Sequence, residues 1–368
     1  MFSKVHRKPV DKYLVILLAI LVVVGFIIFS SASLGLFAKN STQFSNVTFT
    51  QTLFGLLGGT LCCIALSRTD YKIFKGWAWL ILIGSILVTL LVFIPNLGMS
   101  HGGALRWIKI GSFTFQPSEL LKLGVVIFLA AWFSAKKGSA ETFKRGTLPL
   151  LITLAVAGIV FLIQPDTDNF LVTAFASLAV FLAAGGSKRH VFVMAIIGVI
   201  LMSVLAYQRP YIKERFLIFF NPDQKALSSG YQAKQSLIAV GSGGLMGRGY
   251  GQSLQKFTHL PEPIGDSIFA VAAEEFGFIG ASSLVLLFVL FSMRCLKIAA
   301  NTEDSFGRLL IVGIVILLIS QAFLNIGAML GVLPLTGITL PFVSHGGSSL
   351  LVVLAEMGIV LSISRKRI

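Results

Sequence analysis

The chain has 368 residues, of which 55% are hydrophobic and 12% charged, and its mean hydropathy is +0.88. Soluble domains are about a quarter charged, so this composition excludes an ordinary soluble enzyme and predicts an integral membrane protein. We attribute the net charge of +15 to membrane topology and anionic lipid, not to nucleic acid. The cysteines lie in or at the end of apolar runs, which predicts small core residues and no disulfide framework: Cys62, Cys63 and Cys295.

Apolar runs long enough to cross the hydrocarbon layer, which takes about 20 helical residues, recur along the whole chain. They are 13–32, 49–66, 76–94, 117–134, 148–163, 169–185, 190–207, 267–293, 308–331 and 347–364. The first run follows basic residues, as in a signal peptide, but it is longer than such a segment usually is. We therefore predict an all-α integral membrane protein of about ten transmembrane helices, with residues 1–368 forming a single polytopic membrane domain.

The distribution of lysine and arginine predicts the orientation. If the N-terminus is inside, the inner segments hold nineteen of these residues and the outer segments ten. Cytoplasmic loops carry such an excess, so we predict that both termini are cytoplasmic.

The outer connections predicted by this topology are unusual. A large loop of about 208–265, between helices 7 and 8, holds seven basic residues that topology does not require, and long loops in compact proteins are often functional. Segments 94–119 and 333–349 are rich in Gly, Pro and Ser. This composition predicts ordered, non-helical backbone, which a membrane tolerates only where it is packed in protein or wet.

The fourth helix begins with the stretch QPSELLK, which places two opposite charges on one face. Glu119 lies in the first turn, where the positive helix end favours an acid, and Lys122 follows at i+3. A capped helix start with a lysine reaching the surface would explain both residues. A lysine roughly 7 Å below the surface more often faces a cavity or a partner, so we predict that both residues help to bind substrate.

The large loop contains a glycine- and serine-rich stretch, YQAKQSLIAVGSGGLMGRGYGQ, with Lys234 and Arg248 in it. Such a run beside basic residues can cradle phosphate. It matches neither the P-loop nor the dinucleotide fingerprint, so a flexible loop explains it equally well.

Four acids lie in the stretch LPEPIGDSIFAVAAEEFGFIG, where the eighth helix begins. Asp266 could simply cap that helix. A cap does not explain Glu274 and Glu275, which lie roughly 12–14 Å further along the axis, where carboxylates are costly unless protonated, paired or facing water. Together with Glu119 and Glu356, these acids predict a polar cavity that opens outward, with Asp266 at its mouth.

Several of these stretches together resemble the SEDS family (shape, elongation, division and sporulation), the RodA and FtsW proteins. They are SSAS (30–33), GGALRWIKIGSFTFQPSELLKL (102–123), QPD (164–166), GYQAKQSLIAVGSGGLMGRGYGQSLQKFTHLPEPIGDSIFAVAAEEFGFIG (230–280) and LPLTGITLPFVSHGGSSLL (333–351). The resemblance spans nearly all of the chain, and LPEPIGDSIFAVAAEE and TGITLPFVS look more like FtsW.

The resemblance implies a peptidoglycan glycosyltransferase, a hexosyltransferase that polymerises lipid II during cell division or elongation, with its essential aspartate at Asp266. It further implies a bacterial cell (inner) membrane location and a class B penicillin-binding protein, a transpeptidase, as partner. Two residues depart from the family pattern: Asp168 stands where glycine is common, and His345 where tyrosine is usual.

The chemistry that the resemblance implies needs two kinds of group. A sugar hydroxyl that attacks an anomeric carbon needs a base, and the departing polyprenyl pyrophosphate needs positive charge. We predict that Asp266 is the base or else a ligand of a divalent cation, Mg or Mn, and we predict no organic cofactor. Phosphate contacts are predicted for Lys122, Arg215, Lys234 and Arg248, and further substrate contacts for Glu119 and Glu274.

Two alternatives remain open at this point. A flippase for a lipid-linked oligosaccharide would also need a polar cavity and helix-embedded charges, and its signature would be interrupted helices in two related halves. A structural scaffold is the other, and it leaves the helix-embedded acids unexplained.

Overall fold

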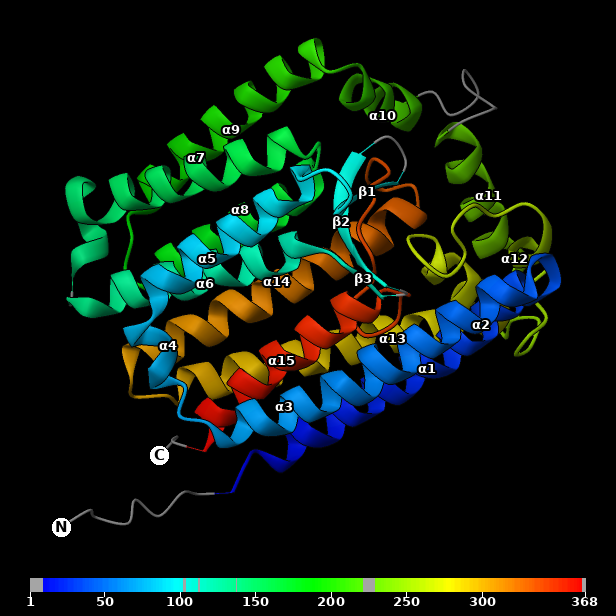
Figure 1. The fold of residues 1–368 in the computed structure, drawn as a ribbon, viewed down its shortest axis with the longest axis horizontal. Coiled ribbons are helices and arrows are strands. Elements are labelled where there is room, and N and C mark those ends of the chain that lie inside the picture. The colour runs from blue at the N-terminus through cyan, green and yellow to red at the C-terminus, as the bar shows by residue number, and fades with distance from the viewer. Residues whose placement is uncertain (1–8, 102–103, 112, 137, 221–228, 366–368) are drawn as a thin grey trace.

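The structure is a computed structural model that describes residues 9–101, 104–111, 113–136, 138–220 and 229–365. Its long helices run roughly side by side as one bundle (Figure 1). In chain order the helices are α1 (Lys12–Lys39), α2 (Ser41–Thr50), η1 (Gln51–Gly58), α3 (Gly59–Arg68), α4 (Lys72–Gly76), α5 (Ala78–Leu90), η2 (Leu91–Phe93), α6 (Pro117–Ala135), η3 (Ser139–Glu141), η4 (Phe143–Thr147), α7 (Leu148–Ile163), α8 (Thr167–Ala183), α9 (Lys188–Gln208), α10 (Pro210–Phe220), α11 (Ser229–Ser242), α12 (Gln255–Thr258), α13 (Ile268–Ala300), α14 (Ser305–Met329) and α15 (Gly347–Ser364).

The predicted membrane spans are present in the described part of the chain. Eight helical segments are long and apolar enough to cross a membrane, and the shorter apolar helices Ala78–Phe93 and Thr167–Ala183 occupy the two remaining predicted positions. The second span is one continuous rod, Ser41–Arg68, that includes a π-helical stretch. It begins earlier than predicted because the residues of α2 are too polar for hydropathy to detect. The prediction of a multi-pass helical membrane protein is confirmed.

The centre of the bundle is formed by α6, α14 and α15. Their most apolar stretches are 72%, 67% and 89% buried, respectively, whereas that of α9 is not buried at all. Close packing against α15 depends on small residues: a Cβ at Gly358 would lie 2.6 Å from the carbonyl oxygen of Cys63 on α3. Small residues let membrane helices approach closely, so α15 is enclosed by protein while α9 lies at the lipid-facing edge.

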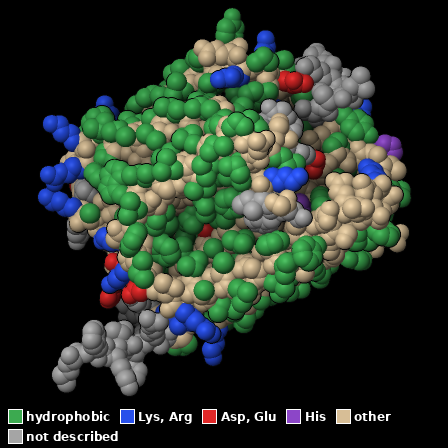
Figure 2. All heavy atoms as spheres, in the orientation of Figure 1, with side chains coloured by type: hydrophobic (Ala, Val, Ile, Leu, Met, Phe, Trp, Pro, Cys, Tyr) green, Lys and Arg blue, Asp and Glu red, His purple; other side chains and the backbone are tan. Residues whose placement is uncertain are grey.

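Both ends of the described chain lie at one end of the bundle (Figure 1). The amide of Asp11 donates to Ser364 Oγ at 3.2 Å, and its carboxylate caps α1 by accepting from the Leu14 amide at 2.8 Å. The same carboxylate accepts two hydrogen bonds from Arg294 of α13, at 2.9 and 2.5 Å. Lysines and arginines gather at this end in Figure 2.

The opposite end carries the non-helical segments. The segment 94–119, predicted to be non-helical, contains a three-stranded antiparallel sheet in the order β1 (Gly98–His101), β2 (Ala104–Ile110) and β3 (Phe113–Phe115). In its register Ile108 lies opposite Gly98 on one side and Phe115 on the other. This sheet is an addition to the all-α prediction. The second non-helical segment connects α14 to α15 and is named here the 333–346 loop.

The large outer loop is more helical than the sequence suggested. It contains α10, α11 and α12, and residues 221–228 within it lie outside the described residues. On α11, Ser236 and Ala239 are fully buried at i and i+3, which is the spacing of one helix face. The loop is therefore folded onto the bundle by an amphipathic helix.

A break in α13 determines how the rest of this loop is placed. Gly277 has φ 65° and ψ −166°, a conformation that glycine adopts without steric cost. The next two amides therefore lose their partners within the helix. Phe278 donates instead to the carbonyl of Gly244 at 2.8 Å, and Ile279 to that of Leu245 at 3.2 Å.

The carbonyls before the break are also satisfied by the same segment. Arg248 donates its amide to the carbonyl of Glu274 at 3.0 Å, and Gly249 donates to that of Glu275 at 2.9 Å. The break lies about 14 Å along α13 from its start, at membrane depth, where each unpaired backbone group costs several kcal/mol. Residues 243–251, named here the glycine loop, therefore enter the membrane region to supply these partners.

The side chain of Glu275 fixes the segment that follows the glycine loop. Its carboxylate accepts from Lys256 Nζ and from Ser31 Oγ of α1, both at 2.5 Å, and Lys256 Nζ also donates to Ser31 Oγ at 3.0 Å. Lys256 and Glu275 are 0% and 1% exposed. The three side chains thus tie α1, α12 and α13 together inside the protein.

Glu274 acts on the same segment. Its carboxylate accepts from Ser253 Oγ at 2.5 Å and from the amide of Leu254 at 3.1 Å, and it pairs with Arg248 Nε at 3.5 Å. Glu274 is fully buried. Both acids are therefore enclosed and hydrogen-bonded by protein, which corrects the prediction that they line a polar cavity with Asp266 at its mouth.

Breaking the buried Lys256–Glu275 pair should destabilise the fold strongly. Lys256→Met leaves Glu275 buried without its cation, which costs about 3–5 kcal/mol. The double variant with Glu275→Gln should recover part of this loss, as measured by denaturant unfolding in detergent. Lys39→Met, at an exposed lysine, is the control and should stay close to the parent. Equal stability of Lys256→Met and the control would contradict this role.

The orientation can be tested with cysteines at the two ends of the bundle. Lys213 on α10 and Lys144 in η4 are both exposed, at opposite ends. On intact cells an impermeant thiol reagent should label Lys213→Cys and not Lys144→Cys, because the charge distribution predicts that the termini are inside. The reverse pattern would overturn the orientation. The unsubstituted protein gives the background labelling of the native cysteines, Cys62, Cys63 and Cys295.

Candidate active site

Charged side chains from separate elements meet around Gly337 of the 333–346 loop. A Cβ placed there would lie 3.7 Å from Arg215 Nη2, 3.8 Å from Arg106 Nη1 and 3.8 Å from Asp168 Oδ2. These residues come from α10, β2 and α8. Asp266 interacts electrostatically with all three of these charges. The fold therefore brings two guanidinium groups and two carboxylates together at the end of the bundle opposite the termini.

Asp168 and Arg215 form the tightest contact of this cluster. Arg215 Nη1 donates to Asp168 Oδ1 at 2.8 Å and to Oδ2 at 2.7 Å. Asp168 Oδ2 also accepts from the amide of Gly337 at 3.0 Å. The carboxylate lies in the first turn of α8, where the helix dipole favours negative charge. Asp168, which stands where the family pattern has glycine, thus joins α8, α10 and the 333–346 loop.

The QPD stretch holds the second guanidinium. Arg106 donates through Nη2 to the carbonyl of Pro165 and through Nε to that of Gln164 at 3.4 Å. Its Nη1 lies 3.9 Å from Asp166 Oδ1, and Asp166 Oδ2 accepts from Asn169 Nδ2 at 2.9 Å. Arg106 is therefore fixed by the α7–α8 connection, which aligns its guanidinium beside that of Arg215.

The backbone around Asp266 is held by two neighbouring helices. Asn325 of α14 donates to the carbonyls of Asp266 and Ile338, both at 2.7 Å. Gln232 of α11 donates to Ser267 Oγ at 3.0 Å. The N-cap position of α13 is Ser267, and Asp266 makes no capping hydrogen bond there. The alternative that Asp266 serves only as a helix cap therefore does not describe this structure.

The surroundings of Asp266 change its acidity. Its side chain keeps part of its surface open, although protein surrounds it on most sides. Burial, the negative charges of Glu262 and Asp168 and the weaker opposing effect of Arg215 and Arg106 together raise the pKa of Asp266 to about 7. A carboxyl group with a pKa near neutrality can exchange a proton with substrate at physiological pH.

The 333–346 loop also supports the turn before Asp266. The amide of His345 donates to the carbonyl of Ile264 at 2.7 Å, and Ser344 Oγ donates to that of Gly265 at 2.8 Å. The His345 ring stacks on Phe29 with 6.0 Å between ring centroids. Burial lowers the pKa of His345 to about 4, so this departure from the family pattern contributes packing and no charge at neutral pH.

The predicted Glu119–Lys122 pair lies deeper, in a separate buried cluster. Lys122 Nζ donates to Glu119 Oε1 at 3.0 Å and to Gln321 Oε1 of α14 at 2.9 Å. Glu356 of α15 interacts electrostatically with both charged residues. Gln321 Nε2 donates to the carbonyl of Thr339 at 3.0 Å. Through Gln321 this buried cluster contacts the 333–346 loop, which also carries Gly337 of the site.

The remaining predicted residues lie elsewhere. Arg248 and Glu274 contact each other in the glycine loop region, about 12 Å along α13 from Asp266. Lys234 is exposed on α11, two residues from the Gln232 that contacts Ser267. Of the predicted set, only Arg215 is among the charged residues that act electrostatically on Asp266.

The sequence did not predict that Arg106, Asp168 and Asn325 belong to the site. Arg106 and Asp168 stood in stretches that were noted for their family resemblance, so position in those stretches was the available signal. Asn325 lies in an apolar helix, and a lone amide there gave no indication of its partner.

Comparisons with known proteins agree over almost the whole chain. A family model described as a cell cycle protein, covering FtsW, RodA and SpoVE, matches residues 11–368. Stage V sporulation protein E of Bacillus subtilis is 36% identical, over 96% of this chain and 97% of that one. A probable peptidoglycan glycosyltransferase FtsW of Geobacter sulfurreducens is 33% identical, over 98% and 97%.

Solved structures give the same result. A chain from work on the structural coordination of polymerization and crosslinking by a peptidoglycan synthase complex has a TM-score of 0.80 and 28% identity, covering 97% of this chain and 98% of that one. The rod shape determining protein RodA of Thermus thermophilus has a TM-score of 0.70 and 28% identity, covering 97% of each chain. With its helix order, its site and these matches taken together, this chain belongs to the FtsW, RodA and SpoVE family, the SEDS proteins.

Proposed function

We propose that the protein is a peptidoglycan glycosyltransferase that joins lipid II units into glycan strands, with the reaction at Asp266. The observation that carries this proposal is Asp266 itself: Asn325 holds its backbone carbonyl, and its carboxyl group interacts electrostatically with the guanidinium groups of Arg215 and Arg106. Relatives that match nearly the full length of the chain are named as glycosyltransferases of this kind.

In this reaction the 4-hydroxyl of one sugar attacks the anomeric carbon of another. Asp266 accepts the proton of the hydroxyl group as the new carbon–oxygen bond forms. The bond from the anomeric carbon to the pyrophosphate oxygen breaks, and polyprenyl pyrophosphate leaves with the bonding electrons. Arg215 and Arg106 stabilise the negative charge that grows on the leaving group.

Arg215 can bind the pyrophosphate and still keep its ion pair with Asp168. Asp168 engages Nη1, one of three nitrogens that together carry five N–H donors. The rigid fork of the guanidinium group suits phosphate oxygens. Asp168 is thus a positioning residue that holds Arg215 at the end of α8 while its other donors face the substrate.

We further propose a divalent cation, Mg or Mn, that the protein shares with the substrate. Among the described residues no group of three or more His, Cys, Asp or Glu side chains could hold a metal ion. Asp266 and Glu262 offer the carboxylate oxygens that hard cations prefer. They fit a cation that takes its other ligands from water and pyrophosphate, and such an ion, when bound, would offset negative charge on the leaving group.

The proposed partner is a class B penicillin-binding protein in the bacterial cell membrane, with both termini of this chain cytoplasmic. Support comes from the structural relative solved as part of a peptidoglycan synthase complex and from the lysines and arginines at the end of the bundle that holds the termini. In such a complex the glycan made by this chain would pass to a crosslinking enzyme.

A lipid II flippase is the second candidate, because the interrupted α13 and the buried Glu119–Lys122 cluster are features that transporters use. In this protein, however, the backbone groups freed by the break bind the glycine loop. They are not available to a transported headgroup, so the geometry favours the polymerase.

Asp266→Asn should abolish polymerisation without affecting folding. The amide has nearly the same shape and cannot accept the proton, and loss of general base catalysis costs about 10²–10⁴ in rate. Purified protein with labelled lipid II would be assayed for glycan chains and, in vesicles, for lipid translocation. Glu303→Gln, an exposed acid at the opposite end, is the control. Polymerisation within a few-fold of the parent would exclude Asp266 as the catalytic residue, and translocation without polymerisation by the parent would favour the flippase.

The pH dependence should follow the charge neighbours of Asp266. Because the base must be ionised and its pKa is raised to about 7, the rate should fall about tenfold per pH unit below that value. Asp168→Asn removes a negative neighbour, so it should lower the pKa of Asp266 and shift the fall in rate to lower pH. Arg215→Gln removes a positive neighbour, so it should raise this pKa and shift the fall in rate to higher pH. The polymerisation rate of the parent and of the two variants would be measured as a function of pH. A shift of both variants in the same direction would contradict the assignment of Asp266 as the base.

A further inference from the structure

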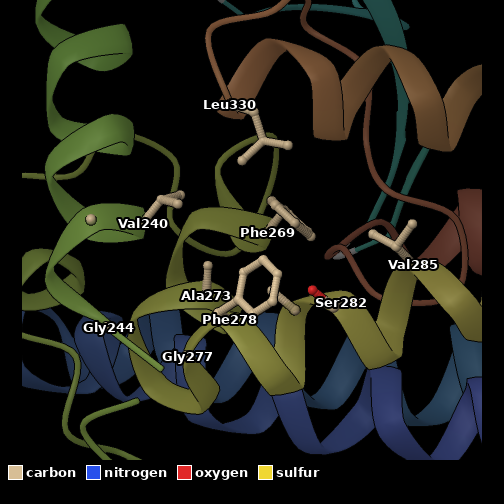
Figure 3. Close-up of a pocket in the computed structure, with 11 residues that line it drawn as sticks. Val240, Gly244, Phe269, Ala273, Gly277, Phe278, Ser282, Val285 and Leu330 are labelled. Carbon is tan, nitrogen blue, oxygen red and sulfur yellow. The ribbon is translucent and has the colours of Figure 1, made fainter. Parts of the chain in front are cut away.

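An apolar groove runs along the outer part of α13 (Figure 3). Its volume is about 360 Å³, within the range of about 300–1,000 Å³ of ligand sites. One wall is α11 and the start of the glycine loop, and the C-terminal end of α14 borders it near Phe269. Its lining is almost entirely apolar and includes Val240, Gly241, Phe269, Phe278, Val285 and Leu330.

The groove exists because small residues lie where two segments approach. Ala273, Gly277 and Ala281 of α13 line the groove before, at and after the break in this helix. On the facing helix Gly241 also lacks a side chain, and a Cβ there would meet no atom within 4 Å. The space beside it is therefore open and not filled by packing.

The groove begins next to the reaction centre. Phe269, at its outer end, is three residues from Asp266, less than one helical turn. From there to Val285 the lining follows α13 for about 24 Å. The helices that border it also hold the start of α13: Gln232 of α11 donates to Ser267, and Asn325 of α14 donates to the carbonyl of Asp266. A ligand whose head lies at Asp266 could thus extend directly into the groove.

We propose that this groove binds the proximal part of the polyprenyl chain of the lipid-linked substrate, the part nearest the pyrophosphate. The inference rests on the proposed function, since that function places a polyprenyl pyrophosphate at Asp266. Phe278, Val285 and Leu330 are 65%, 37% and 40% exposed. The groove is therefore open on its lipid side, so the distal part of the chain can remain in the bilayer.

The size of the groove favours a single hydrocarbon chain over a partner helix. A chain about 4 Å across occupies about 300 Å³ over 24 Å, close to the observed volume of about 360 Å³. A transmembrane helix about 10 Å across would need about 1,900 Å³ over the same length. Binding the first isoprene units here would hold the pyrophosphate near Arg215, because Phe269 at this end of the groove is three residues from Asp266.

Filling the groove at Gly241 tests the proposal with little risk to folding. Gly241 of α11 lines the groove, and a Cβ there meets no atom within 4 Å, so Gly241→Leu adds apolar bulk at the groove wall. We expect KM for long-chain lipid II to rise about tenfold, with kcat nearly unchanged, and a smaller effect for Gly241→Ala. Gly198→Leu on α9, where a Cβ also meets nothing within 4 Å, is the matched control and should behave as the parent.

Substrate chain length gives the decisive comparison. With a lipid II analogue whose prenyl chain is too short to reach Phe278, the parent and Gly241→Leu should have the same KM. An unchanged KM for the long-chain substrate, or an equal rise for both substrates, would overturn the proposal. Loss of binding to a co-expressed penicillin-binding protein with KM unchanged would show that the groove seats a partner helix instead.

A binding measurement separates this proposal from the function on which it rests. Polyprenyl pyrophosphate carrying a diazirine on its first isoprene units should label peptides that contain Val240 and Phe278 after irradiation. Gly241→Leu should remove this labelling and Gly198→Leu should keep it. Labelling elsewhere alone would refute the groove as the site. Labelling at the groove in a protein that does not polymerise lipid II would refute the function and leave the polyprenyl site standing.

Discussion

The outer half of the protein depends on the requirement that no backbone polar group stay unpaired at membrane depth. The break at Gly277 frees amides and carbonyls of α13, and the glycine loop satisfies them. Once this loop is held in the bundle, Glu274 and Glu275 fix the turn behind it, and Lys256 neutralises one of them. The same arrangement sets α11 against α13, which brings Gln232 to Ser267. The position of Asp266 is thus a consequence of how a broken membrane helix is repaired.

Three groups of charges serve different purposes in one small protein. Lys256 with Glu275, and Lys122 with Glu119, are buried pairs completed by neutral hydrogen-bonding partners. Such pairs are held in place because breaking either leaves a buried charge. Asp266 differs because its nearest charges do not cancel: anionic Glu262 and Asp168 outweigh Arg215 and Arg106 after the effect of burial. The raised pKa of Asp266 therefore lets its carboxyl group accept and release a proton near neutral pH, whereas the carboxylates of Glu119 and Glu275 are held in ion pairs.

The sequence predicted those parts of the protein that depend on local pattern. Hydropathy located the spans, and the i, i+3 spacing found Glu119 and Lys122 as a true pair. The pairing of Arg215 with Asp168, and of Asn325 with the carbonyl of Asp266, joins segments far apart in the chain, and no periodicity reports such contacts. Glu274 and Glu275 were misread for the same reason, since their partners Ser31 and Ser253 lie on other elements. A buried acid in a helix predicts that a partner exists, but it does not say whether that partner is substrate or protein.

The charge balance of the site predicts that substrate binding changes the ionisation of Asp266. With Asp266 ionised, the carboxylates of Asp166, Asp168, Glu262 and Asp266 outnumber the guanidinium groups of Arg106 and Arg215. A pyrophosphate diester adds about two more negative charges, and like charges disfavour ionisation of a nearby acid. Arrival of the donor therefore makes Asp266 a stronger base, but it also drives Asp266 toward its protonated form. The divalent cation proposed above, carried by the pyrophosphate, would offset this negative charge and favour the ionised form of Asp266.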